Sequence, residues 1–130
     1  MRENIVLLLG RLLLAWIFVH EGVFLLVNYA ASSAGMTKLG VPAFAVALVI
    51  ALQLVAGFAI AVGCYARCGA AALGLFCLAT AMLFHTNFAI RNELLHFEKD
   101  LAIAGGMFLL TVCGSGQWSV DGWRKAARRA

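Results

Sequence analysis

The stretch WIFVHEGVFLL, from Trp16 to Leu26, places a histidine beside a glutamate inside an apolar run that begins at Ile5. Both His20 and Glu21 can take up and release protons. An ionisable side chain near the middle of a bilayer costs between about 2.5 and more than 10 kcal/mol, depending on the scale. A buried carboxylate must therefore be paired or protonated. The pair predicts a polar network or a proton-handling site at this level.

A second polar group is expected near the other end of the same apolar run. Arg11 stands about 9 Å inside that end at 1.5 Å per residue, and Gln53 lies near the middle of another apolar segment. Counted from the helix ends, the two differ by about 6 Å in height. We therefore predict an inner cluster of Arg11 with Gln53.

An outer cluster is predicted from Glu21, His85 and Lys99, with His20 and His96 nearby. Lys99 is unfavourable at a helix N-terminus, so a carboxylate partner such as Glu21 would explain it. Each of these residues also has a plainer interpretation. Arg11 would extend its charged group to the membrane interface. His20 would form an interhelical hydrogen bond, and His85 and His96 would be ordinary interface residues.

The sequence predicts no metal site. The histidines lack the local spacing of metal ligands, and the four cysteines lack the paired spacing of a zinc site. It also contains no phosphate-binding glycine loop, nucleophile motif or haem attachment sequence.

The composition indicates an integral membrane protein. Of the 130 residues, 64% are hydrophobic and 12% are charged, whereas soluble domains are about 45–50% apolar and about 25% charged. Each apolar segment approaches the roughly 20 residues that span about 30 Å of hydrocarbon, and lipid admits only helices or closed barrels. We predict an all-α membrane protein, a single-domain four-transmembrane-helix bundle. The expected helices cover 5–27, 41–63, 68–84 and 101–118.

Three connections are expected. Residues 29–40 are small and polar, 64–67 form a tight turn, and 86–99 read either as an amphipathic helix in the interface or as an ordinary loop. Small residues at every fourth position predict close helix packing. They are Ala66, Ala70 and Gly74 in the third segment, and Ala102 and Gly106 in the fourth. The first segment is too long and too polar for a typical cleaved signal peptide.

Charge placement predicts the orientation. With four spans, one side carries Arg2, Arg67, Arg124, Lys125, Arg128 and Arg129, and the other carries Lys38, Arg91 and Lys99. The positive-inside rule places both termini in the cytoplasm, with residues 119–130 as a basic cytoplasmic tail. The cationic tail favours the lipid bilayer as its partner and not nucleic acid, for which there is no recognition motif.

Four stretches carry a resemblance to a known family: LLGRLLLAWIFVHEG, LGVPAFAVALVIALQLVAG, VGCYARCGAAALGL and FEKDLAIAGGMFLLTVCGSGQWSVDG. Over residues 5–123 the chain resembles the DoxX family of small bacterial inner-membrane proteins. Most specific is the last stretch, with Lys99 before AIAGG, then Gly-Ser-Gly and Ser119-x-Asp121. The resemblance implies a four-helix bundle in the bacterial inner membrane. Some members are associated with redox reactions at the membrane. One is a subunit of a thiosulfate:quinone oxidoreductase, and another is a partner of superoxide dismutase and a sulfurtransferase. Others are associated with defence against quinones and thiols.

Two positions depart from the family pattern. Many DoxX proteins carry a glutamate where Gln53 stands, so Arg11 loses the carboxylate partner that the resemblance implies. A lysine that commonly follows the glycine of the first helix is also missing after Gly22.

The leading hypothesis is a membrane redox component that binds a quinone-like molecule or supports a partner that does. A polar cluster under apolar cover suits a ligand with a polar head and an apolar tail. Glu21 and His85 would exchange protons with it, and Arg11 would hold an anionic or carbonyl group. No redox centre is visible in the sequence, so enzymatic activity is left open.

Two other hypotheses stand beside it. One is a structural or assembly subunit whose polar residues fix helix register and hold partner subunits or a second copy. The other is a small transporter, which would need a polar path joining both clusters.

Overall fold

Helices form every regular element of residues 1–129, the part of the chain that the computed structural model describes. The helices are α1 (Arg2–Val27), α2 (Tyr29–Lys38), α3 (Ala43–Val62), α4 (Ala66–Phe84), α5 (Arg91–Cys113) and α6 (Val120–Ala127). The prediction of an all-α fold is confirmed. Residue 130, the last of the predicted tail, lies outside the described residues.

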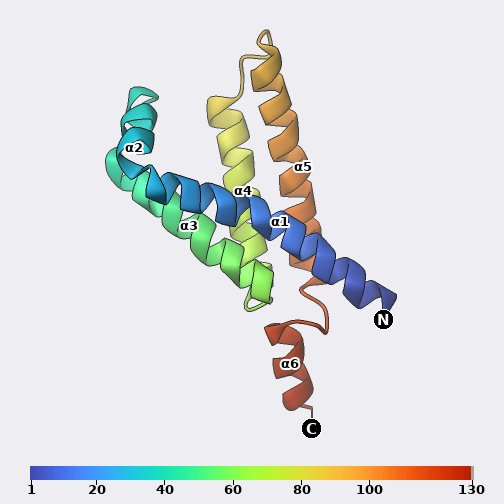
Figure 1. Ribbon diagram of the computed structural model, residues 1–130. Coiled ribbons are helices and arrows are strands. Elements are labelled where there is room, and N and C mark those ends of the chain that lie inside the picture. The colour runs from blue at the N-terminus through green and yellow to red at the C-terminus, as the bar shows by residue number, and fades with distance from the viewer. Residues whose placement is uncertain (130) are drawn as a thin grey trace.

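The helices pack as two tilted pairs (Figure 1). α1 packs against α3, α3 against α4, and α4 most extensively against α5, whereas α1 and α5 contact each other little. Both chain ends lie at the same end of the bundle as the α3–α4 turn, and α2 and the α4–α5 loop lie at the other end.

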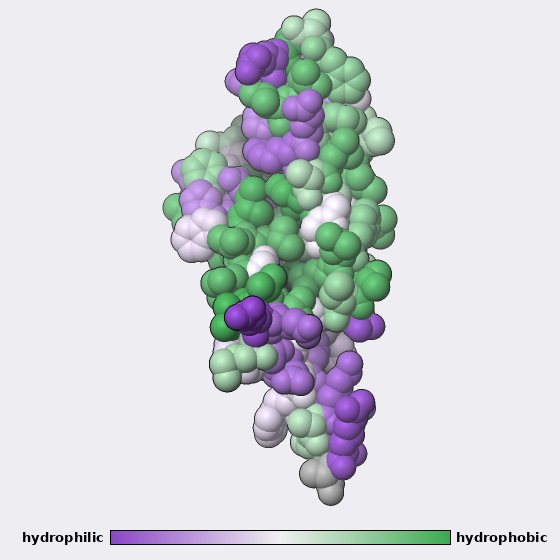
Figure 2. Space-filling view, turned by 90° about the vertical axis from the view of Figure 1, so that its right-hand side faces the viewer, coloured by the Kyte–Doolittle hydropathy of each residue, from purple (hydrophilic) through white to green (hydrophobic). Residues whose placement is uncertain are grey.

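Three of the predicted spans are present as helices long and apolar enough to cross a membrane: α1, α3 and α4. Their outward-facing side chains include Leu13, Val55 and Leu83, each more than 70% exposed. Such exposure is unfavourable in water and suits contact with lipid. Figure 2 shows the same pattern as hydrophobic side chains across the middle of one face, with hydrophilic ones gathered toward its upper and lower ends.

The fourth predicted span differs from expectation at both ends. In place of a separate interface segment over 86–99 and a helix over 101–118, α5 runs without a break from Arg91 to Cys113. No proline interrupts the polar first part, so it continues the helix. α5 ends early because Gly114 and Gly116 adopt φ of 78° and 75°, which only glycine adopts readily. Its apolar part, Leu101–Cys113, is about 20 Å long, short of about 30 Å of hydrocarbon.

The connection predicted over 29–40 is also a helix. α2 follows α1 after Asn28 alone, and the Asn28 side chain donates to the carbonyl of Phe24. The chain returns through Gly40, with φ of 84°, and Pro42 precedes the first residue of α3. Proline suits a helix start because its missing N–H has no intrahelical partner there.

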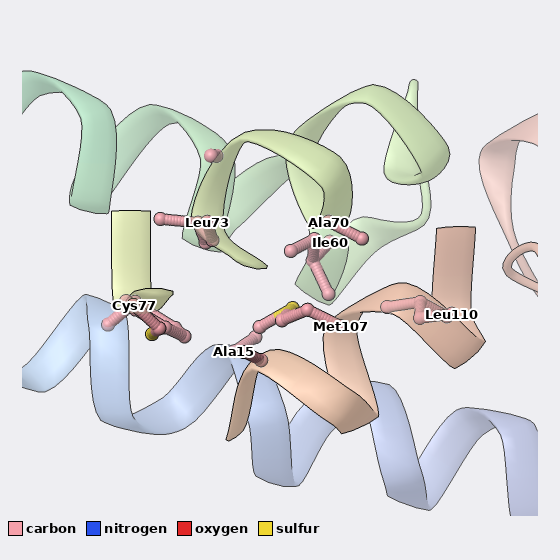
Figure 3. Close-up of a cluster of buried hydrophobic side chains, with 10 residues drawn as sticks. Ala15, Ile60, Ala70, Leu73, Cys77, Met107 and Leu110 are labelled. Carbon is pink, nitrogen blue, oxygen red and sulfur yellow. The ribbon is translucent and has the colours of Figure 1, made fainter. Parts of the chain in front are cut away.

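The hydrophobic core lies where the four long helices meet. Met107 of α5 is fully buried with Ala15 of α1, Ile60 of α3 and Leu73 of α4. Figure 3 shows Met107 near the centre of this cluster, with Ala15, Ile60 and Leu110 around it. The core is built largely of small side chains, so it depends on close helix approach.

Small residues at the helix contacts confirm part of the predicted packing. Ala66 and Ala70 are fully buried, and a Cβ on Gly74 would lie 2.9 Å from Phe108 of α5. The prediction for Ala102 was wrong, because it is exposed and α5 buries Ala104, Met107 and Leu110 instead. At the α1–α3 contact, a Cβ on Gly57 would lie 3.0 Å from Val19.

Replacing Gly57 with leucine should therefore force α1 away from α3. Overpacking of this kind costs about 1–3 kcal/mol. Gly57→Leu should therefore unfold at a lower SDS mole fraction than wild type. The measurement is loss of helical circular dichroism as SDS is added to mixed micelles. Gly105→Leu is the matched control, because no atom lies within 4 Å of a Cβ at that position. Equal unfolding of the two variants would contradict the close α1–α3 contact.

Candidate functional site

Arg11 is a buried cation that ties α1 to the end of the chain. Its side chain is only 4% exposed. Nη1 donates to the Ser115 carbonyl and Nη2 to the Trp118 carbonyl, both at 2.7 Å. Both terminal nitrogens of the guanidinium thus donate to backbone oxygens of the loop after α5, whereas Nε is buried without a hydrogen-bond partner in the described residues. Arg11 does not snorkel; it is a structural tie.

The residues around Arg11 form what we call the Arg11 junction: Arg11, Gly63, Ser115, Ser119 and Asp121. The Ser119 hydroxyl accepts from Gly122 N at 2.9 Å and caps α6. Asp121 N donates to the Gly63 carbonyl at 2.9 Å. A side chain on Gly63 would collide with Arg11 and Ser119, so the close approach requires glycine.

The Asp121 carboxylate closes the junction onto α4. Its two oxygens accept from Tyr65 N and Ala66 N, each at 3.1 Å. These N–H groups belong to the first turn of α4, where intrahelical acceptors are missing. The closing Ser119-x-Asp121 motif therefore has a structural role: it caps two helices and holds α6 against the α3–α4 turn.

The predicted cluster of Arg11 with Gln53 was wrong. A Cβ on Gly22 would lie 3.3 Å from Gln53 Cβ, so this register sets Gln53 opposite Gly22. Arg11 instead lies beside Gly63, at the α3–α4 turn. The count from the helix ends failed because α1 begins at Arg2, before the predicted start, and because α1 and α3 cross at a tilt.

Gln53 belongs to a different site, which we call the Gln53 pocket. This cavity of about 450 Å³ lies between α1, α3, α4 and α5, below α2. Its apolar lining includes Phe18, Leu25, Met36, Val49, Phe76, Phe84 and Ile103. Its polar lining is Glu21, Gln53, Thr80, His85, His96, Lys99 and Asp100. Four predicted site residues, Glu21, Gln53, His85 and Lys99, thus line one cavity.

Gln53 has an unsatisfied polar atom. Its side chain is 7% exposed, and Oε1 has no hydrogen-bond partner within the part of the chain that the structure describes. A buried amide without a partner costs about 1–3 kcal/mol. The cavity beside it is where a partner could bind.

The opposite wall of the pocket carries a hydrogen-bonded polar group. His85 Nδ1 lies 2.9 Å from Glu93 Oε2, and the rings of His85 and His96 stack with centroids 5.1 Å apart. On the same wall the Thr80 hydroxyl lies 3.1 Å from Asp100 Oδ2. These contacts join α4 to the polar part of α5 and can hold or pass a proton.

Glu21 and Lys99 line the pocket without pairing. Within residues 1–129 no ion pair joins them, and the Glu21 side chain is 52% exposed. Lys99 is also exposed. His20 does not line the pocket: its side chain is 60% exposed and its ring stacks on Trp16 at 6.0 Å.

Sequence reasoning missed several members of both sites. Thr80 is a polar residue inside an apolar segment, and this position could have indicated that it lines a polar site. Asp100 stands just before the span predicted over 101–118, but α5 begins at Arg91, so Asp100 lies inside the helix. The acceptors of Arg11 are backbone carbonyls, which no side-chain pattern reveals.

Comparison with known proteins gives the family. Residues 6–86 match the DoxX family model. The chain is 39% identical over 119 residues to the inner membrane protein YqjF of Escherichia coli K12, covering 92% of each chain. The chain belongs to the DoxX family. The DoxX protein is also 28% identical over 124 residues to the E. coli inner membrane protein YphA, covering 90% of this chain and 89% of that one. No solved structure gave a significant match.

These relatives and the three apolar helices confirm the predicted inner-membrane location. The DoxX model matches α1 to α4, which include Arg11, Glu21, Gln53 and Thr80. The closing motif of the Arg11 junction lies outside the residues that the DoxX model matches.

Substituting Arg11 with methionine should loosen the end of this DoxX protein. The Ser115 and Trp118 carbonyls would lose their donors, which costs about 1–3 kcal/mol of local stability. Trypsin should then cut at Arg124 and Lys125 at least about fivefold faster in detergent. Arg2→Met, which removes an exposed cation from the same helix, should cleave like wild type. Unchanged cleavage of Arg11→Met would contradict the junction.

Proposed function

We propose that this protein is a component of a membrane redox system whose Gln53 pocket binds a quinone-like molecule. The observation that carries the proposal is the buried Gln53 amide, which has an unsatisfied oxygen at the wall of a largely apolar cavity. A ligand that completes Gln53 Oε1 must present a hydrogen-bond donor to it, such as the hydroxyl of a quinol, and an apolar body to the aromatic and aliphatic walls.

The polar residues of the pocket suit the two ends of a quinone ring. Gln53 Nε2 can donate to the carbonyl of a quinone, and the unpaired Oε1 can accept from the hydroxyl of the reduced quinol. His85, held by Glu93 at 2.9 Å, supplies a second polar group that can give or take a proton. A bound quinone would supply the electron-transfer chemistry, and the chain would bind it, orient it and supply protons.

The opening of the pocket supports entry from the bilayer. α1 and α5 make few contacts with each other, and Glu21 of α1 and Lys99 of α5 are both exposed residues of the pocket wall. A ligand dissolved in lipid can therefore reach Gln53 between these two helices. Charged groups at such an opening would meet the polar head of the ligand before it enters.

Removing the Gln53 amide should weaken quinone binding. Loss of one hydrogen bond of about 1–1.5 kcal/mol predicts a roughly tenfold higher Kd for Gln53→Leu. The measurement is saturation of crosslinking by a photoreactive azidoquinone with an alkyl tail, in mild detergent. His20→Phe is the matched control, because His20 neighbours Glu21 but does not line the pocket.

Two results would contradict the proposal. One is crosslinking that does not saturate with wild-type protein. The other is equal saturation of wild type and Gln53→Leu, with the label outside the pocket. The hypothesis of a structural subunit would be favoured by a different result. In that case the protein would copurify with a partner subunit and no quinone, and substitutions of the polar residues would change only that assembly.

We also propose that α5 is a fourth span and that both termini are cytoplasmic. Both chain ends and the α3–α4 turn share one end of the bundle, and Arg67 and the basic residues of α6 lie there. The positive-inside rule favours the cytoplasm for that end. The polar first part of α5 would then face the pocket and the opposite interface.

Labelling of Cys68 tests this orientation. Cys68 is exposed at the start of α4, so a membrane-impermeant maleimide added to intact spheroplasts should leave it unlabelled and should label it after lysis. A cysteine introduced by Ala34→Cys in α2 should react in intact spheroplasts, because residue 34 is exposed at the other end. Labelling of Cys68 before lysis would contradict the proposal.

A further inference from the structure

A second cavity lies at the opposite end of the molecule from the Gln53 pocket. This basic cleft, of about 890 Å³, is formed by the start of α4, the loop after α5 and α6. Five cationic side chains line it: Arg67, Arg124, Lys125, Arg128 and Arg129. The Gln53 pocket makes no use of them.

The charge of the cleft is not neutralised within residues 1–129. No carboxylate there lies within 4 Å of any of the five cations, since the ion pairs in that range are His20–Glu21 and His85–Glu93. Two acidic residues, Glu3 and Asp121, also line the cleft. Asp121 is committed, because both of its oxygens accept from backbone N–H groups of Tyr65 and Ala66. A concave surface with surplus positive charge attracts an anion.

Two of the cations are held in place. The Arg124 guanidinium lies over the Tyr65 ring, 5.5 Å from its centroid, and Nη1 contacts Cys64 Sγ at 3.5 Å. Arg67 packs against Gly114, where an added Cβ would lie 3.0 Å from Nε. α6 is itself fixed by the Ser119 cap and by Asp121 N on the Gly63 carbonyl. The cleft is therefore formed before any anion arrives.

The surroundings indicate the source of the anion. Trp123 and Tyr65 line the cleft and are 71% and 69% exposed. Exposed tryptophan and tyrosine beside arginine and lysine are typical of the headgroup level of a membrane. The spanning helices α3 and α4 meet at this end, next to the hydrophobic band. We propose that the basic cleft binds the phosphate group of an anionic phospholipid and thereby anchors α6 to the membrane surface.

The test is competition between lipids on the full-length protein. Native mass spectrometry counts the lipids retained when phosphatidylglycerol and phosphatidylcholine are supplied in equal amounts in mild detergent. Wild type should retain phosphatidylglycerol in preference. The double variant Arg67→Gln/Arg124→Gln should lose about tenfold or more of that preference, because each cation near anionic lipid contributes to binding.

The matched control is Lys38→Gln/Arg91→Gln, which removes the same charge from exposed positions outside the cleft. It should retain phosphatidylglycerol like wild type, and equal helical circular dichroism and elution would show that both variants are folded. No preference in wild type, or equal loss in the control, would overturn the proposal. Displacement of the lipid by millimolar inorganic phosphate would also overturn it, since the cleft would then bind soluble phosphate.

Discussion

Polar groups among apolar helices must find their partners within the chain, because hydrocarbon offers none. The Arg11 junction meets this constraint at most of its polar groups, with Arg11 Nε left without a partner in the described residues. One guanidinium holds two carbonyls of the loop after α5, and Asp121 of the same segment caps α4. Helices that are far apart in the sequence are thus joined at one end by hydrogen bonds. The tight turn at Gly63 and the position of α6 both depend on these contacts.

The two polar regions differ in where their unpaired atom lies. At the junction, Arg11 Nε has no partner in the described residues, but Arg11 lines neither cavity and its two terminal nitrogens are paired. In the pocket, Gln53 Oε1 is buried without a partner in the described chain, while His85 and Glu93 satisfy each other nearby. An unpaired buried amide is costly to keep unless a ligand completes it. The packing agrees, since α1 and α5 contact each other little and both contribute residues to the wall of the cavity.

The sequence was sufficient for the elements and insufficient for their register. Long apolar runs predicted α1, α3 and α4, because a single segment that crosses lipid must pair its own backbone groups and therefore forms a helix. The α5 boundaries failed because glycine φ angles and the tilt of packed helices are not readable from composition. Glu21, His85 and Lys99 line one cavity, but the predicted pairing of Lys99 with Glu21 is not formed within residues 1–129. Gln53 was assigned to Arg11 because the crossing of α1 and α3 sets which residues face each other, and a count along straight helices does not.

The central claim is that a small redox lipid completes the Gln53 amide. The most direct measurement is native mass spectrometry of wild type and Gln53→Leu, each purified in mild detergent from the same membranes. Wild type should carry a bound molecule of quinone mass that is lost or strongly depleted in Gln53→Leu. It is contradicted if wild type carries no such molecule, or if the variant keeps the same amount. The pocket would then be an interhelical void, and its polar residues would serve packing or assembly.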